Sequence, residues 1–278
     1  MAEVLIGSEA VAGGLTEYQL RRWYKPIFRD VFVPKGREPT LRDRTRGAWL
    51  WSRRRAVVAG AAAAALHGAR WIDADVPIEL IFKSSRPQRG LLVRNEMLAN
   101  DEITRVAGLP VTTPARTAFD LGRHLPRAQA LARLDALMRA TPFSRATVGG
   151  LATRHRGSPG VRQLRSVLPL VDSGAASPKE TWLRLLLIDA GFPAPATQIP
   201  VHENWHLVAM LDMGWQEVGV AVEYDGDQHR TERRQYVRDI GRLRKLESLG
   251  WVVIRVIAED RPIDVVQRVA EARARRRR

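Results

Sequence analysis

The chain has 278 residues, of which 45% are hydrophobic, so it is long enough for about two domains with cores of their own. It contains no cysteine, which excludes disulfide scaffolds, thiolate zinc sites, iron–sulfur clusters and cysteine nucleophiles. The formal net charge is +15, from 45 Lys and Arg residues against 30 Asp and Glu residues. This charge favours a phosphate polymer as partner, so we expect a nucleic acid; an arginine-rich composition inherited from a GC-rich genome is the alternative explanation.

No segment predicts export or insertion into a membrane. The first residues carry Glu3 and Glu9 and have no basic flank, so they do not resemble a signal peptide. The longest apolar run, from Ala56 to Leu66, is shorter than the roughly 18–20 residues that span a bilayer. We therefore expect a cytoplasmic protein without a membrane partner.

The first elements predict a small DNA-binding unit. Residues 15–24 have helical spacing, and residues 28–33 alternate like a short strand. A basic helix followed by a short hairpin is typical of a winged helix. Arg21 and Arg22 on that helix are therefore candidate DNA contacts.

The next residues predict a mixed α/β region, in which alanine-rich and amphipathic helices alternate with short apolar strands. Thr113 and Pro114 have the pattern of an N-cap followed by the first helical residue. We expect helices at 56–66, 128–139 and 144–155, strands at 78–82 and 91–94, and a strand, a turn and a helix across 109–121.

Turn-forming residues indicate where the chain divides. Residues 158–160 and 172–176 are rich in glycine and serine, which favours linkers and places the domain boundary near residue 170. We predict an N-terminal domain at 1–170, with a winged-helix-like part at 1–55 and an α/β part at 56–170, and a second domain at 171–278.

The second domain is predicted to have the order α-β-β-α-β-α. The chain as a whole is therefore expected to be α/β or α+β. The expected helices span 177–190, 231–249 and 263–272, and the expected strands span 205–213, 217–225 and 251–257.

Three carboxylates lie at the ends of two consecutive predicted strands. Asp212 ends the first strand, and Glu223 and Asp225 end the second, where their spacing of two places them on one face. A hairpin would bring Asp212 close to Glu223 or Asp225. Massed carboxylates repel each other unless a cation or a proton lies between them. Because Mg²⁺ prefers oxygen ligands, the pattern predicts a site for Mg²⁺ or Mn²⁺ beside a phosphodiester.

The motifs around these acids resemble the PD-(D/E)XK nuclease superfamily, and more narrowly the very-short-patch-repair-like endonucleases. The resemblance covers about residues 175–260. Its motifs are Ser177-x-x-Glu180, Leu211-Asp212, Val222-Glu-Tyr-Asp-Gly226, His229, and the run Arg238-Asp239-x-x-Arg242-x-x-x-Leu246-x-x-x-Gly250-Trp251-x-Val253-x-Arg255. It implies a restriction-endonuclease-like fold that hydrolyses a phosphodiester.

The resemblance also implies roles for individual residues. Asp212 and Glu223 would be the first metal ligands, and Glu180 an accessory ligand from a helix. His229 would transfer a proton or stabilise the leaving group. Asp225 stands where the wider superfamily has lysine, which leaves the general base open. Glu180 also fits a capping box, and His229 also fits a helix-entry residue without chemistry.

Three further charged residues have two interpretations each. Asp239 and Arg242 would orient the site or contact phosphate, or they form a surface ion pair three residues apart on a helix. Arg255 would face the phosphate groove or solvent. Arg242 and Arg255 are thus the candidate nucleic-acid contacts of the second domain.

The N-terminal motifs resemble the N-terminal portion of a second family, the AbiEi-type antitoxin-like proteins, over roughly residues 1–125. This resemblance implies a winged-helix regulator with a toxin or phage-defence partner. Its motifs are Gly14-Leu-Thr-x-x-Gln-Leu20, Ala65-Leu-His-Gly68 and the run from Leu109 to Leu121.

The two resemblances lead to one hypothesis and two rivals. We expect a metal-dependent DNA endonuclease with an N-terminal DNA-binding region. The first rival is a DNA-binding regulator or antitoxin-like protein whose nuclease fold is inert. The second is a structural or protein-interaction role in phage defence. The type of substrate (mismatched, nicked, duplex or single-stranded DNA, or RNA), its sequence and the oligomeric state stay open.

Overall fold

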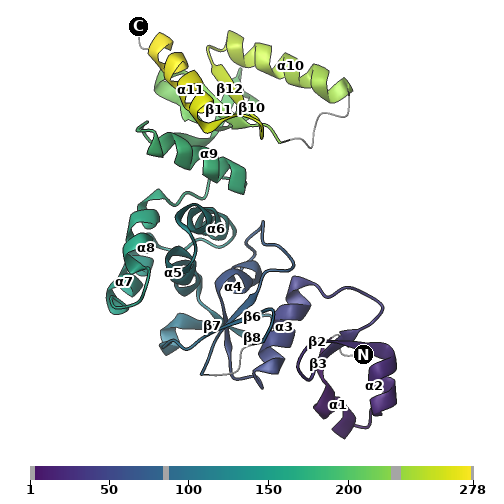
Figure 1. Ribbon diagram of the computed structural model, residues 1–278. Helices are drawn as coiled ribbons and strands as arrows, with labels where there is room; N and C mark the ends of the chain where they lie inside the picture. Colours follow the sequence, from purple (N-terminus) through teal and green to yellow (C-terminus); the bar gives the residue numbers. More distant parts are fainter. Residues whose placement is uncertain (1–3, 84–87, 227–232, 277–278) are drawn as a thin grey trace. The chain divides into compact units, whose positions relative to one another are not determined.

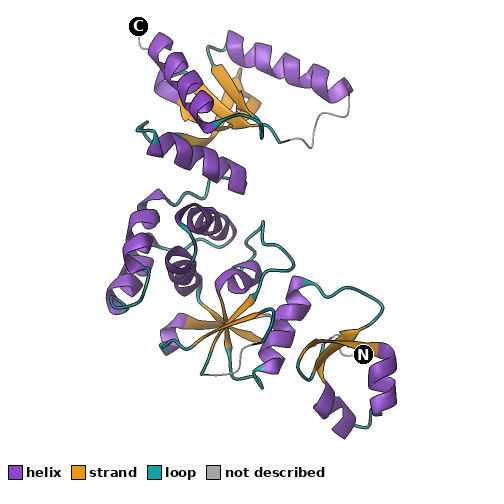
Figure 2. Ribbon diagram, viewed as in Figure 1, coloured by secondary structure: helices purple, strands orange, loops and turns teal. Residues whose placement is uncertain are grey.

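The computed structural model describes residues 4–83, 88–226 and 233–276. In these ranges the protein has eleven α-helices and three sheets, which are antiparallel or mixed (Figures 1 and 2). The predicted α/β class is therefore confirmed. The chain divides into two compact units, Met1–Val171 and Asp172–Arg278. None of the helices in the described ranges is long and apolar enough to cross a membrane.

The N-terminal unit begins with a small three-stranded sheet in the order β1-β3-β2. The single strand predicted at 28–33 is wrong, because the chain reverses at Asp30, whose φ is 60°. The apolar alternation continues through this turn from one strand into the next. The elements are β1 (Leu5–Ile6), α1 (Gly7–Ala12), α2 (Glu17–Trp23), β2 (Tyr24–Phe28), β3 (Val31–Pro34) and α3 (Leu41–Trp51).

A five-stranded sheet follows, in the order β6-β5-β4-β8-β7. Its strands are β4 (Val57–Ala59), β5 (Ile78–Ile81), β6 (Leu91–Arg94), β7 (Ile103–Val106) and β8 (Leu109–Thr112). The apolar run at 56–66, predicted to be one helix, is a strand and then a helix. Gly60 separates them with a φ of 58°, at a position where a Cβ would lie 2.6 Å from the Glu79 carboxylate.

Five helices accompany this sheet, and most of them begin where the sequence indicates. Thr113 caps α5 by accepting a hydrogen bond from the backbone N–H of Arg116, and Pro114 is the first helical residue. The helices are α4 (Gly60–Leu66), α5 (Pro114–His124), α6 (Arg127–Ala140), α7 (Arg145–Arg154) and α8 (Val161–Val167).

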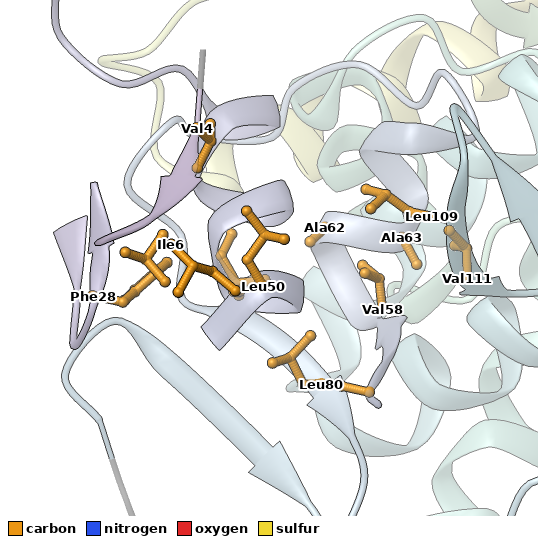
Figure 3. Packing of buried hydrophobic residues seen from close by; sticks show 14 of the residues in the cluster. Val4, Ile6, Phe28, Leu50, Val58, Ala62, Ala63, Leu80, Leu109 and Val111 are labelled. Carbon is orange, nitrogen blue, oxygen red and sulfur yellow. The ribbon is translucent and has the colours of Figure 1, made fainter. Parts of the chain in front are cut away.

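One hydrophobic core joins the two sheets of the N-terminal unit. Ile6 and Phe28 of the small sheet pack in the same cluster as Leu50 of α3 and Val58 and Leu80 of the large sheet (Figure 3). Each fully buried side chain of this size contributes roughly 1.5–3 kcal/mol. The small sheet is therefore part of the same folded body as the α/β region that follows it.

The C-terminal unit is built on a four-stranded sheet in the order β12-β11-β10-β9. The predicted order omitted β9, which forms a hairpin with β10. The second predicted strand starts later than expected, at Val220, because residues 216–218 form a 3₁₀ turn. The elements are α9 (Pro178–Asp189), β9 (Ala196–Glu203), β10 (His206–Trp215), β11 (Val220–Tyr224), α10 (Arg233–Ser248), β12 (Val252–Val256) and α11 (Pro262–Arg276).

The helices of the C-terminal unit belong to two separate cores. Leu183 of α9 and Val265 of α11 pack in one cluster with Met213 of β10. Leu246 of α10 packs in the other cluster, with Leu211. The sheet is therefore covered by α10 in one core and by α9 and α11 in the other.

Candidate functional site

Strand pairing in the C-terminal unit brings the predicted site residues to one end of the sheet. β10 and β11 form the antiparallel hairpin that the sequence predicts. Asp212 of β10 accepts a hydrogen bond from the backbone N–H of Tyr224 in β11, with 2.9 Å between Oδ2 and N. Glu223 of β11 lies opposite Arg255 of the parallel strand β12. Asp212 and Glu223 therefore lie on neighbouring strands beside a basic residue.

Asp212, Glu223 and Asp225 line one pocket of about 210 Å³. Arg242 and Arg255 line the same pocket, so it presents charges of both signs. Its full lining is Met210, Asp212, Glu223, Tyr224, Asp225, Asp239, Arg242 and Arg255.

Glu223 and Arg242 form a bidentate ion pair in this pocket. The two guanidinium nitrogens Nη1 and Nη2 lie 2.9 and 2.8 Å from the two carboxylate oxygens of Glu223. Glu223 is buried, and this geometry is the strongest form of a carboxylate–guanidinium contact. The hydrogen bonds to Glu223 raise the pKa of Arg242. Arg242 is thus directed at a carboxylate of its own unit, and its charge neutralises an acid that the sequence assigned to a metal.

Asp225 has a similar partner. Arg255 Nη2 lies 2.7 Å from Asp225 Oδ2, and the backbone N–H of Asp225 donates to the carbonyl of Val256. The Arg255 side chain is partly exposed. Arg255 lines the pocket and is directed toward the carboxylates. Of its two predicted orientations, toward the phosphate groove or toward solvent, it has the one that faces the pocket.

Asp212 differs from both other acids, because within the described ranges no ion pair joins it to a cation. Burial raises the pKa of Asp212 to about 7, and the negative charges of Glu180 and Glu223 add to the rise. The Tyr224 N–H and the charge of Arg242 lower that pKa without cancelling the rise. Near neutral pH, Asp212 therefore exchanges a proton, and it does so among other carboxylates.

Glu180 reaches this cluster from α9. Its side chain is buried and accepts a hydrogen bond from the backbone N–H of Ala176, with an O–N distance of 2.8 Å. The Glu180 backbone N–H donates to Ser177 Oγ, which caps the helix. The serine half of the predicted capping box is present, but the Glu180 carboxylate accepts from Ala176 rather than from the N-cap residue Ser177. The same carboxylate raises the pKa of Asp212.

The residue types at this site suit a divalent cation, but the way their side chains are paired does not. Two acids, Glu180 and Glu223, lie near Asp212, which is the charge pattern that a hard cation relieves. However, Arg242 holds both oxygens of Glu223 and Arg255 holds Asp225. In the described part of the chain, the group of acids and histidines with ligand atoms all within 4.8 Å lies in the other unit. A metal shared by Asp212 and Glu223 would have to compete with Arg242.

The remaining predicted residues belong to the other unit or fall outside the described residues. His229 falls in the range that the structure does not describe. Arg21 and Arg22 are exposed on α2 of the N-terminal unit. Arg21 pairs with Glu17 at 3.3 Å, and Arg22 Nη1 lies 3.4 Å from the Tyr18 hydroxyl. Both arginines are therefore on an accessible surface of that unit.

A buried ionic network in the N-terminal unit was missed from the sequence. Arg116 and Arg123 of α5 both donate to Asp120, which is fully buried, and both also pair with Glu96. His124 lies 3.3 Å from the same Glu96. The spacing of Arg116, Asp120 and Arg123 along one face of a helix was the available signal. Because these acids are held by guanidinium groups, we assign the network to stability.

Comparisons with known proteins place the chain in a family. Residues 54–170 match the AbiEi antitoxin C-terminal domain. Two relatives, Uncharacterized protein MT2308 (Mycobacterium tuberculosis, strain CDC 1551 / Oshkosh) and Uncharacterized protein Rv2248 (strain ATCC 25618 / H37Rv), are each 32% identical over 252 residues, or 89% of this chain and 87% of theirs. The chain belongs to the family of these mycobacterial proteins. No solved structure gives a significant match.

The match corrects the extent of one predicted resemblance. The AbiEi likeness is confirmed over 54–170, and the matching part of that family is its C-terminal domain rather than the N-terminal portion expected at 1–125. The very-short-patch-repair-like resemblance of residues 175–260 stays a prediction, as does the winged-helix assignment of residues 1–55.

Proposed function

We propose that the protein is a DNA-binding, antitoxin-like regulator with a toxin or phage-defence partner. The observation that carries this proposal is the match of residues 54–170 to the AbiEi antitoxin C-terminal domain. The net charge of +15 supports DNA as a ligand. The exposed arginines of α2, Arg21 and Arg22, are the proposed phosphate contacts of the N-terminal unit.

Binding to duplex DNA at several salt concentrations tests this proposal. The variant with Arg21→Gln and Arg22→Gln is compared with the intact chain and with Arg162→Gln, an exposed arginine of α8 in the same unit. Each lost phosphate contact should lower the slope of log affinity against log salt by about one. An unchanged slope in the double variant would remove α2 from the DNA interface, and no duplex binding at all would contradict the proposal.

A second candidate function is Mg²⁺- or Mn²⁺-dependent cleavage of DNA in the C-terminal unit. The observation that favours it is Asp212, a carboxylate with a pKa of about 7 that results from burial and the charges of Glu180 and Glu223. Perturbed acids of this kind concentrate at catalytic and metal sites. In this proposal Asp212 and Glu223 hold the metal, with Asp225, Glu180 and His229 assisting. Arg242, once displaced from Glu223, would pair with a substrate phosphate.

Plasmid cleavage separates the two functions. Supercoiled plasmid is incubated with the intact chain and Mg²⁺ or Mn²⁺, beside an EDTA control and the variants Asp212→Asn and Glu259→Gln. Glu259 is an exposed acid of the same unit that does not line the pocket, so it controls for the loss of one charge. The endonuclease is supported if cleavage is lost in the EDTA control and in Asp212→Asn but is kept in Glu259→Gln. If the chain binds duplex DNA but does not cleave the plasmid, the endonuclease proposal is contradicted and the regulator is the function that is supported.

A further inference from the structure

A second pocket lies in the N-terminal unit and includes none of the acids discussed above. Its volume is about 390 Å³, which is within the usual range of small-molecule sites. It is bounded by the turn between β2 and β3, by the end of α3, and by Phe82 and Gln88. Its lining is Ile6, Arg29, Asp30, Val31, Leu50, Trp51, Ser52, Arg53, Arg55, Phe82 and Gln88.

Positive charge dominates the polar part of this pocket. Arg29, Arg53 and Arg55 line it, against one carboxylate, Asp30. Arg53 is held by Asp30, with 3.0 Å between Nη2 and Oδ2. Within the described part of the chain, no salt bridge joins Arg29 or Arg55 to an acid, and the Arg55 side chain makes a 3.4 Å contact with the carbonyl of Ser52. Two guanidinium groups are therefore available to an anion.

The backbone around the pocket is held in an uncommon conformation. Asp30, Arg53 and Arg54 have φ values of 60°, 56° and 63°, in the left-handed region that residues other than glycine seldom adopt. Arg54 points elsewhere and forms a bidentate pair with Glu9, at 2.7 and 2.6 Å. The strained turn after α3 thereby places its two flanking arginines in one pocket, and such strain is frequent at ligand sites.

The rest of the pocket is aromatic and apolar. Trp51 and Phe82 contact each other edge to face, with ring centroids 5.8 Å apart, and both are only partly buried. Ile6 and Leu50 form the apolar floor and belong to the core of the unit (Figure 3). Aromatic rings beside arginines are the combination that stacks a base while holding its phosphate.

We propose that this pocket binds a nucleoside phosphate, either as a free nucleotide or as one nucleotide unit of a single strand. Arg29 and Arg55 hold the phosphate, and the surface of Trp51 and Phe82 packs on the base. The pocket shares no residue with the acidic site or with the arginines of α2. Its test is therefore independent of the proposed function.

The test is calorimetric titration of the full chain with AMP, ATP, inorganic phosphate and a short single-stranded oligothymidylate. The variants are Arg29→Gln and Arg55→Gln, with Arg162→Gln as the matched control for one lost exposed arginine. Each pocket variant should weaken nucleotide binding about tenfold, since each removes a charge-assisted hydrogen bond. Trp51→Leu should weaken the binding of AMP and leave that of inorganic phosphate unchanged, with thermal melting as the check on its fold.

The outcomes distinguish the source of the ligand. AMP binding that falls in both pocket variants supports a free nucleotide, and an effect confined to the oligothymidylate supports a strand. The proposal is overturned if none of the four ligands binds, if Arg29→Gln and Arg55→Gln behave like Arg162→Gln, or if inorganic phosphate binds as tightly as AMP. Duplex binding in the same preparations reports separately on Arg21 and Arg22.

Discussion

The two units both bury carboxylates, but they surround them differently. In the N-terminal unit, burial would raise the pKa of Glu96, yet the hydrogen bond from His124 and the charge of Arg123 lower it to about 2. In the C-terminal unit, burial and the neighbouring acids raise the pKa of Asp212 to about 7. For these two half-buried acids, contact with a cationic group decides the direction of the pKa shift. Full burial outweighs such contacts at Asp120, whose pKa is raised although Arg116 and Arg123 both contact it.

The largest expected effect comes from removing the cation at the centre of the N-terminal network. Arg116→Met leaves Asp120, Glu102 and Glu96 with fewer partners, and Asp120 and Glu102 are both buried. Breaking a buried ion pair on one side costs about 3–5 kcal/mol in the free energy of unfolding. Urea denaturation of the N-terminal unit measures this loss. A loss below about 1 kcal/mol would show that the network is not a stabilising element, and Arg162→Gln should change the free energy by less than about 0.5 kcal/mol.

The pKa of Asp212 is raised, whereas that of Glu96 is lowered, so Asp212 should make the folded chain less stable as the pH rises. Its folded pKa of about 7 lies above the unfolded value of about 3.9, so between these pH values the folded chain keeps a proton that the unfolded chain has lost. The free energy of unfolding therefore falls as the pH rises from about 4 to about 7, by roughly 4 kcal/mol from this group. Asp212→Asn should flatten that part of the stability curve. An identical slope in both chains would contradict the shift.

The Glu223–Arg242 pair is expected to give a smaller effect. Arg242→Met leaves the buried Glu223 without its bidentate partner, which should cost about 2 kcal/mol because the arginine side chain is partly exposed. It should also raise the pKa of Asp212 further, since the Arg242 charge lowers that pKa. Denaturation gives the first quantity and a carboxyl-carbon NMR titration the second. A lower pKa of Asp212 in this variant would refute the assignment.

The smallest expected effect is that of Glu180→Gln. Glutamine still accepts the Ala176 N–H, so α9 should keep its cap and the stability should change by less than about 0.5 kcal/mol. The negative charge is gone, however, and the pKa of Asp212 should fall. The same NMR titration measures the fall. An unaltered pKa would mean that Glu180 does not contribute to the shift at Asp212.

Much of the fold could be predicted because its signals are local. Thr113-Pro114 and Ser177-Pro178 mark helix starts that the structure has at those residues. The elements that the sequence did not predict are set by contacts with distant parts of the chain rather than by the local spacing of apolar residues. β9 alternates over only three residues, with Ile199 and Val201 buried on either side of Pro200, and it extends to eight residues through its pairing with β10. Gly60 divides an apolar run that has no polar residue to mark the change.

The sequence predicts which acids gather at the candidate site, but it does not predict which arginines pair with them. Asp212 and Glu223 lie close together because a hairpin joins their strands, which the alternation of residues indicates. Arg242 reaches Glu223 only through the rotation of α10 over the sheet, which no spacing in the sequence fixes. For the same reason the pairing of Glu96 with Arg116 and Arg123, far along the chain, could not be foreseen.

The parallel pairing of β11 with β12 leads us to expect a particular order of assembly for the acidic site. β9, β10 and β11 are joined by hairpins and close short loops, whereas β12 pairs with β11 only after the chain crosses over through α10. Contacts of long sequence separation form late, because their loop entropy is lost before they are stabilised. We therefore expect Glu223 to meet Arg242 and Arg255 late in the folding of this unit. The raised pKa of Asp212 belongs to the assembled unit, because it depends on burial and on Glu180 of α9 as well as on Glu223 of the sheet.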